Sequence, residues 1–164
     1  MIILGIDPGT ARLGYGVLRK EGARLTHLEH GCLETPKTMP QPERLLELQR
    51  RLEAIIARHA PETLGIEKLF FAKNAKTAMS VSEARGMVLV AAQAANITIL
   101  EHTPTQVKQA VVGYGAADKK QVQEMIKRLL DLPAIPRPDD AADALAVAYC
   151  AAVSFIPPRI FTSN

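Results

Sequence analysis

The stretch that decides the fold is Ile3-Leu4-Gly5-Ile6-Asp7-Pro8-Gly9-Thr10. The chain is apolar from Ile2 to Ile6, which is typical of a strand that is buried on both faces of a sheet. Asp7-Pro8-Gly9 then ends the strand with turn-forming residues. The sequence thus places a carboxylate at the end of a buried strand, where it is either a plain turn former or part of a functional site.

Two more strands follow, over residues 15–18 and 25–33, and the Glu21-Gly22 turn between them predicts an antiparallel meander. After a polar loop over 35–42, five apolar residues recur at helical spacing: Leu45, Leu48, Leu52, Ile55 and Ile56. Pro61 ends this helix. A short strand is expected over 63–66, and it stops at Glu67.

The second half of the chain continues the alternation of helices and strands. We expect a helix over 76–95, a strand over 97–100, helices over 104–112 and 119–130, and a last helix from about 140 to about 153. This order predicts an α/β protein with a mixed five-stranded sheet that is flanked by helices on both faces. One domain over residues 1–155 and a short C-terminal tail, 156–164, are expected.

Composition narrows the class of protein. The chain has 164 residues, of which 48% are hydrophobic, so it can form a buried core without disulfides. Cys32 and Cys150 stand far apart in apolar surroundings, which predicts buried free thiols and not a disulfide or zinc site. No apolar run reaches the roughly 18 residues of a membrane span. We therefore expect a protein of the reducing cytoplasm that has no membrane contact.

The distribution of charge is more informative than the net charge of +3. Residues 68–128 hold nine Lys or Arg and four Asp or Glu, whereas residues 129–164 hold two Lys or Arg and four Asp or Glu. A basic middle beside an acidic end suits a nuclease, because cations bind the phosphate backbone and carboxylates bind metal. Charge alone, however, is more typical of a solvated helical surface.

Four acids stand where core patterning would not place them. Asp7 and Glu67 each end an apolar strand, and Asp140 and Asp143 open the last helix three residues apart, on one face. If the two strands are neighbours in the sheet, their ends meet the start of that helix. Each acid also has an ordinary explanation, as a turn former, a solvated strand end or a helix cap. We interpret Asp139 as the cap or as a charge beside the site.

Clustered carboxylates repel one another and lose hydration, and a bound cation relieves both costs. Ligands that are all oxygen select hard ions such as Mg²⁺ or Mn²⁺. Two such ions about 4 Å apart can hold the attacking and the leaving oxygen of a phosphodiester. We find no convincing nucleophilic Ser or Cys, and the four histidines, His27, His30, His59 and His102, lack metal-ligand spacing.

Four blocks of sequence resemble one protein family, the RuvC Holliday junction resolvases. They are residues 3–10 with Gly14-Tyr15-Gly16, residues 66–75, the block Gln106-Val107-Lys108-Gln109 with residues 111–115, and residues 140–146. The blocks occur in order and cover nearly the whole chain. The resemblance implies an RNase H-like fold and a homodimeric endonuclease that makes paired, symmetric incisions in four-way junction DNA, in homologous recombination and DNA repair.

The resemblance also implies a cofactor, site residues and partners. The family's catalytic, metal-binding acids match Asp7, Glu67, Asp140 and Asp143, and they imply Mg²⁺, with Mn²⁺ as a substitute, and two ions per subunit. The implied protein partner is the RuvA–RuvB branch-migration complex. The DNA-contacting set comprises the positions that match the family's stacking aromatic and lysines, together with neighbouring residues: Phe70, Phe71, Lys73, Lys108, Lys119 and Lys120. Either Phe70 or Phe71 can be the ring that stacks on DNA, and Phe71 and Asp139 are small departures from the family's pattern.

Three other readings share some of these residues. Asp7-Pro8-Gly9-Thr10 also resembles the first phosphate motif of the sugar-kinase, actin and heat-shock-protein class, but that class uses two such domains and a second Gly-rich loop. YqgF-like relatives share the strand-end Asp, although they lack the blocks over 66–75 and 106–115. A junction-binding module without catalysis is the third, and a cleavage assay separates it from a nuclease.

Overall fold

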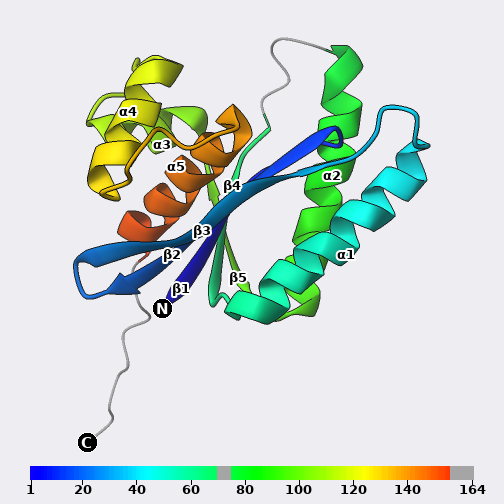
Figure 1. The fold of residues 1–164 in the computed structure, drawn as a ribbon, viewed down its shortest axis with the longest axis horizontal. Coiled ribbons are helices and arrows are strands. Elements are labelled where there is room, and N and C mark those ends of the chain that lie inside the picture. The colour runs from blue at the N-terminus through cyan, green and yellow to red at the C-terminus, as the bar shows by residue number, and fades with distance from the viewer. Residues whose placement is uncertain (70–74, 156–164) are drawn as a thin grey trace, which may run out of the picture.

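The computed structural model describes residues 1–69 and 75–155 (Figure 1). Three residues that we predicted to contact DNA, Phe70, Phe71 and Lys73, lie outside the described residues, as does the predicted tail over 156–164. None of the described helices is long and apolar enough to cross a membrane.

A five-stranded sheet forms the centre of the fold. Its strands are β1 (Ile2–Asp7), β2 (Arg12–Glu21), β3 (Arg24–Glu34), β4 (Thr63–Glu67) and β5 (Thr98–His102), in the order β3-β2-β1-β4-β5. β1, β2 and β3 pair antiparallel, as the predicted meander requires, and the two-residue turn between β2 and β3 has Gly22 at a φ of 59°. β4 pairs parallel with β1 and with β5. The predicted mixed sheet is confirmed.

Five helices cover the two faces of this sheet (Figure 1). α1 (Gln41–His59) and α2 (Ala75–Ala94) lie on one face, and α3 (Pro104–Val112), α4 (Lys119–Leu129) and α5 (Asp139–Ser154) lie on the other. Each face has its own apolar core, one around Leu4, Leu52 and Val88 and the other around Val107, Ile126 and Leu145. The predicted covering of both faces is therefore confirmed.

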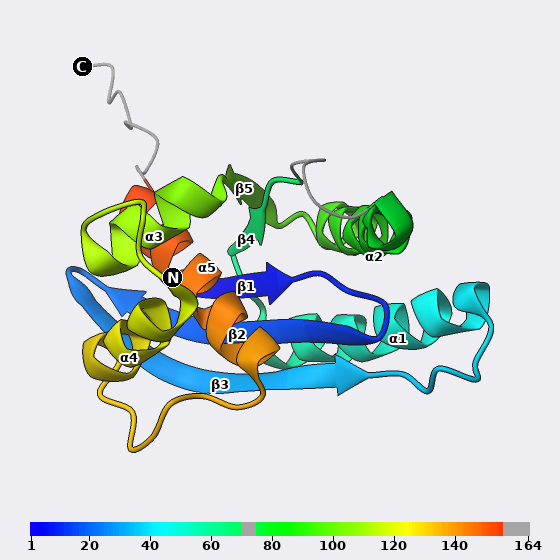
Figure 2. The same cartoon turned by 90° about the horizontal axis from the view of Figure 1, so that it is seen from above.

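Helix α5 packs directly on β1 and β2 (Figure 2). Ten of its residues are buried. Eight of them have small side chains, seven alanines and Cys150, and the other two are Leu145 and Val147. The strands beneath α5 also carry residues without bulky side chains, such as Gly5 of β1. A Cβ atom on Gly5 would lie only 2.2 Å from the carbonyl oxygen of Ala144, so only glycine fits there. This close packing brings the start of α5 to the ends of the strands.

Several boundaries differ from those we predicted. We placed Pro42 in a loop, but α1 begins at Gln41 and contains Pro42 in its first turn, where the missing N–H of proline has no helical partner to lose. β2 and β5 are longer than predicted because pairing with their neighbours continues through polar residues, to Glu21 and His102. Both cysteines are free, although Cys32 is only half-buried, whereas Cys150 is buried as expected.

Candidate active site

Asp7 and Glu67 lie side by side at one end of the sheet. Each is the last residue of its strand, β1 and β4 run parallel, and Ile6 is the register partner of Ile66. The next position along the two strands therefore places Asp7 beside Glu67. The two strands are thus neighbours, which was the condition for their ends to meet the start of the last helix, and parallel neighbours end at the same edge of a sheet.

Asp140 reaches this edge because β2 has a glycine there. Gly14 is the register partner of Asp7, and a Cβ atom on Gly14 would lie 2.0 Å from the carbonyl oxygen of Asp140. The first turn of α5 thus lies against the strand pair at the level of Asp7. Asp143 follows three residues later on the same face of α5. Three separate elements, β1, β4 and α5, therefore contribute the four acids.

The acids in the first turns of α5 do not cap the helix. The N-cap residue is Pro138, and no side chain forms a capping hydrogen bond there. Our interpretation of Asp139 as the cap is wrong, because Asp139 is the first residue of the helix itself. Its carboxylate lies 2.5 Å from Nη1 of Arg137 and 3.6 Å from Nζ of Lys119, so it is a charge beside the site.

The pKa values show that the four acids share one electrostatic field. The pKa of Asp7 rises from 3.8 to about 7, first because of burial and then because of the charges of Asp143, Asp140 and Glu67. Burial and the charge of Asp143 also raise the pKa of Glu67. Burial raises the pKa of Asp143, although Lys119 acts in the opposite direction. These carboxylates destabilise one another when all are ionised.

Two cations that lie directly against these acids partly offset the repulsion. Nζ of Lys119 lies 2.8 Å from Oδ2 of Asp143, and Nη1 of Arg12 lies 3.7 Å from Oδ2 of Asp140. Both cationic side chains are more than half exposed, whereas the two acids are about one-third exposed or less. The cations therefore lie at the solvent side of the acids. The ion pair of Arg12 could not be predicted from the sequence, because an ion pair between residues so distant in the chain leaves no local pattern.

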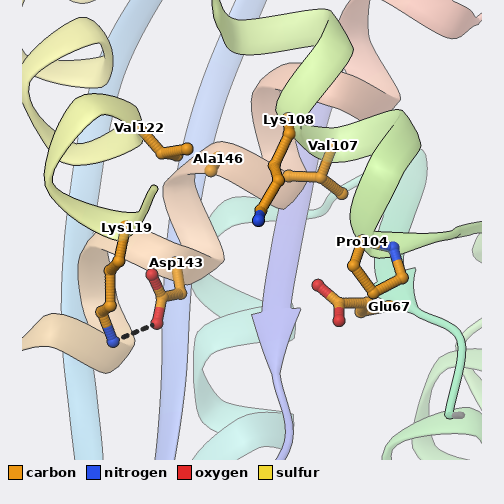
Figure 3. Close-up of a pocket in the computed structure, with 8 residues that line it drawn as sticks. All are labelled: Glu67, Pro104, Val107, Lys108, Lys119, Val122, Asp143 and Ala146. Carbon is orange, nitrogen blue, oxygen red and sulfur yellow. Dashed lines mark hydrogen bonds and ion pairs between the residues drawn. The ribbon is translucent and has the colours of Figure 1, made fainter. Parts of the chain in front are cut away.

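A pocket of about 240 Å³ opens between these groups (Figure 3). In Figure 3, Glu67 and Asp143 lie on opposite sides of the pocket, and Lys108 points from α3 toward the space between them. The lining residues are Glu67, Asp143, Lys108 and Lys119, with Pro104, Val107, Val122 and Ala146 as apolar walls. Asp7, Asp140 and Lys120 are not among the lining residues, and the exposed Lys120 stands one residue beyond Lys119.

Capping boxes position both pocket lysines. Thr103 caps α3 through a reciprocal pair of hydrogen bonds with Gln106, and Asp118 caps α4 in the same way with Gln121. Lys108 and Lys119 thus project from well-anchored helical turns. The patterns Thr-x-x-Gln over 103–106 and Asp-x-x-Gln over 118–121 were visible in the sequence and could have fixed both helix starts.

The donor chemistry at this edge suits a hard divalent cation. All four acids offer carboxylate oxygens, and their mutual repulsion is the interaction that such a cation relieves. In the described part of the chain, however, no three His, Cys, Asp or Glu side chains are already grouped closely enough to hold a metal ion. Metal binding by these acids therefore requires changes of side-chain rotamer, and Asp143 is at present in contact with Lys119.

Comparison with known proteins now identifies the family. Residues 3–151 match the family model described as Crossover junction endodeoxyribonuclease RuvC. The protein of that name from Chloroflexus aggregans is 55% identical over 150 residues, which is 92% of each chain. Its counterpart from Desulfitobacterium hafniense (strain DSM 10664 / DCB-2) is 53% identical over 154 residues, or 94% of this chain and 93% of that one.

Solved structures agree. The T. thermophilus RuvC in complex with a Holliday junction substrate is 38% identical, covers 93% of both chains and superposes with a TM-score of 0.87. The fowlpox virus resolvase in complex with Holliday junction DNA shares the RNase H-like fold, with a TM-score of 0.61 at 15% identity. The family match spans almost the whole described chain, and relatives that are more than half identical align with over nine-tenths of it. This chain therefore belongs to the crossover junction endodeoxyribonuclease RuvC family.

Proposed function

We propose that this protein is a structure-selective endonuclease that resolves Holliday junctions by paired, symmetric incisions, in DNA recombination and repair. The observation that carries the proposal is the meeting of Asp7, Glu67, Asp140 and Asp143 at one sheet edge, beside a pocket with two lysines. The family supports the substrate, because its members are named crossover junction endodeoxyribonucleases and one is solved with a Holliday junction.

Catalysis by this nuclease is metal-dependent, and we propose Mg²⁺, with Mn²⁺ as a substitute, at two ions per subunit. Asp7, Glu67, Asp140 and Asp143 would hold them. A bound divalent cation supplies a water molecule of lowered pKa and neutralises charge on the scissile phosphate. The support for this assignment is the all-carboxylate donor set and the raised pKa of Asp7, about 7, which marks strong mutual repulsion.

The chain's own residues then have defined tasks. Lys108 and Lys119 bind and orient the phosphate from two different helices, α3 and α4, as point charges on anchored helical turns. Asp7 and Glu67 are both partly buried, which keeps part of the bulk water away from their carboxylates. In the reaction the oxygen of a water molecule forms a bond to phosphorus as that water gives up a proton. The bond from phosphorus to one sugar oxygen breaks, and this sugar oxygen takes up a proton.

Further DNA contacts are proposed at the remaining members of the predicted set. Lys120 is exposed at the first turn of α4, next to Lys119, and can extend the contact along the backbone. For Phe70, Phe71 and Lys73 the support is the sequence alone: two aromatic rings and a cation in a segment that follows Glu67 directly. One ring would stack on an unpaired base at the junction, for roughly 1–3 kcal/mol.

Paired incisions require two active sites, and we propose a homodimer. Helix α2 supports it, because Met79 and Val90 are 73% and 65% exposed and lie on one stripe with Gly86, whose absent side chain lets another helix approach. An open groove continues this stripe, lined by Leu89, Val90, Gln93, Ala94, Ile99 and Glu101. A two-fold dimer through this surface would give two acid clusters related by one axis, which matches the symmetry of a four-way junction.

Other parts of the proposal rest on the family and the sequence. The RuvA–RuvB branch-migration complex is the proposed protein partner, and the cytoplasm, where such DNA lies, is the proposed compartment. The nuclease would be one domain over residues 1–155 with a tail over 156–164.

The test is cleavage of a labelled four-way junction and of a duplex with the same arms, each in Mg²⁺ or in EDTA. We expect symmetric cuts in the junction in Mg²⁺ only. Binding of the junction without cleavage in Mg²⁺ and in Mn²⁺ would favour the non-catalytic junction-binding module instead.

A further inference from the structure

Lys119 contacts carboxylates in the structure, although in the proposed function it binds a DNA phosphate. Its ammonium group lies 2.8 Å from Asp143 and 3.6 Å from Asp139, so it is bound to carboxylates that belong to or adjoin the acid cluster. In the proposed function, however, Lys119 binds a DNA phosphate, and Asp143 binds a metal ion. One ammonium group cannot neutralise Asp143 fully and a phosphate fully at the same time.

The side chain of Lys119 can leave Asp143 without a change in the backbone. The backbone of Lys119 is fixed at the first turn of α4 by the Asp118–Gln121 capping box, whereas its side chain is 54% exposed. A long, flexible lysine stem can therefore swing without any movement of the helix. Asp139 has a second cation besides Lys119, because Arg137 lies 2.5 Å from its other oxygen. Release of Lys119 thus leaves Asp139 with Arg137, but leaves Asp143 without an ion pair among the described residues.

The other cations near the acids differ in this respect. Arg12 lies 3.7 Å from Asp140 and also 3.4 Å from Glu34, so its charge is already shared with a residue outside the cluster. Lys108 forms no ion pair within residues 1–69 and 78–155, although its charge lowers the pKa of Glu67 against the raising effects of burial and Asp143. Among the cations whose side chains the structure describes, Lys119 alone combines a direct hydrogen bond to a proposed metal ligand with a side chain that is more than half exposed.

We propose that Lys119 exchanges between Asp143 and a DNA phosphate, so that metal binding and DNA binding strengthen each other through this one side chain. A divalent cation at Asp143 displaces Lys119 and makes it available to phosphate. A phosphate, in turn, withdraws Lys119 from Asp143 and removes a competitor of the metal. Such coupling is reciprocal by thermodynamic necessity. The inference rests on the proposed function, since it needs the metal at the acid cluster.

The first experiment measures metal affinity without DNA and without turnover. Mn²⁺ is titrated into EDTA-stripped, dialysed protein, and the EPR signal of free Mn²⁺ gives the bound fraction. The variants are Lys119→Gln, Asp143→Asn and, as the matched control, Lys127→Gln, which removes the same charge from the same helix about two turns away. We expect Lys119→Gln to bind Mn²⁺ about three- to ten-fold more tightly than wild type, and Lys127→Gln to differ by less than about two-fold.

The second experiment measures the coupling. Junction affinity is determined in EDTA and in Ca²⁺ at matched ionic strength, and the ratio of the two affinities is compared among the same proteins. The ratio should fall about three- to ten-fold in Lys119→Gln and stay unchanged in Lys127→Gln.

The outcomes distinguish a failure of the Lys119 exchange from a failure of the proposed metal site. If Mn²⁺ binds in wild type and is lost in Asp143→Asn, but Lys119→Gln matches Lys127→Gln or binds more weakly, the exchange of Lys119 is wrong and the metal site stands. If wild type shows no saturable Mn²⁺ binding that depends on Asp143, the metal site of the proposed function is wrong, and the exchange falls with it.

Discussion

Gly14 lies directly under Asp140, so that a single methyl group on Gly14 would come within 2.0 Å of the Asp140 carbonyl oxygen. The same glycine is the register partner of Asp7. The distance between the acid at the end of β1 and the acids of α5 is therefore set by an absent side chain. This relationship connects the packing of the fold to the geometry of the site.

Gly14→Ala is the first test. The methyl group must displace the start of α5, and overpacking of this kind costs about 1–3 kcal/mol in the free energy of unfolding. Because the displaced turn carries Asp140, junction cleavage should fall about 100-fold even in the fraction that is folded. Urea unfolding and single-turnover cleavage measure the two effects. Arg19→Ala, exposed on the same strand, is the control and should change neither. An unaltered cleavage rate in Gly14→Ala would show that the position of α5 is not critical.

The raised pKa of Asp7 predicts that removing its charge stabilises the fold, whereas Gly14→Ala destabilises it. In the folded protein Asp7 keeps its proton up to about pH 7, because of burial and the neighbouring acids, whereas an unfolded Asp loses it near 3.8. Metal-free protein should therefore lose stability as the pH rises from about 4 to about 7, and remain less stable above that range. Asp7→Asn removes this loss.

We thus expect Asp7→Asn in EDTA to be more stable than wild type by about 1–3 kcal/mol at pH 8, and equally stable at pH 4. Urea unfolding at the two pH values provides the measurement. Added Mg²⁺ should stabilise wild type and close the gap. A variant that is less stable than wild type at pH 8 would show that the charge of Asp7 is not under repulsion.

Lys108 should act on DNA binding through charge alone. Lys108→Ala is expected to weaken binding to junctions of any sequence, and to reduce the slope of log affinity against log salt by about 0.9. Binding titrations at four or five salt concentrations give the slope. Lys127→Ala, which lies outside the pocket, should leave it unchanged. Equal slopes for wild type and Lys108→Ala would mean that Lys108 is an ordinary surface lysine.

The outer stripe of α2 should decide the oligomeric state. Val90→Glu introduces a charge into the proposed two-fold contact and should shift the protein toward monomer in sedimentation experiments. On a supercoiled plasmid with a cruciform, this variant should leave mainly nicked circles, whereas wild type yields linear plasmid. Leu46→Glu makes the same kind of change at a 48% exposed residue of α1 and serves as the control. Linear product from a monomeric Val90→Glu protein would contradict the pairing of two subunits.

Much of the site's framework could be predicted from sequence, for reasons that are local. Asp7 and Glu67 each follow an apolar run, and adjacent parallel strands end at the same edge, so their meeting needed only the strand order. The start of α5 was equally readable from Asp140 and Asp143. These features depend on periodicity and turn chemistry, which a single sequence displays.

The remaining features depend on long-range packing and on rotamers. Asp139 looks like a cap in the sequence, yet Pro138 takes the N-cap position and Asp139 turns toward Arg137. The pairing of Asp143 with Lys119 joins residues 24 apart, and that of Arg12 with Asp140 spans most of the chain. Neither leaves a pattern in the sequence, because each contact forms only after α4 and α5 pack on the sheet.

The central claim, that Asp7, Glu67, Asp140 and Asp143 form the cleavage centre, has one direct test. Single-turnover cleavage of a labelled four-way junction in Mg²⁺ is measured for Asp7→Asn, Glu67→Gln, Asp140→Asn and Asp143→Asn, with junction affinity determined in parallel. Asp139→Asn is the matched control, one residue from Asp140 but paired with Arg137. We predict loss of cleavage by at least about 1000-fold in the four variants with binding retained, and near wild-type cleavage in Asp139→Asn. Full cleavage by Asp140→Asn together with loss in Asp139→Asn would contradict this assignment.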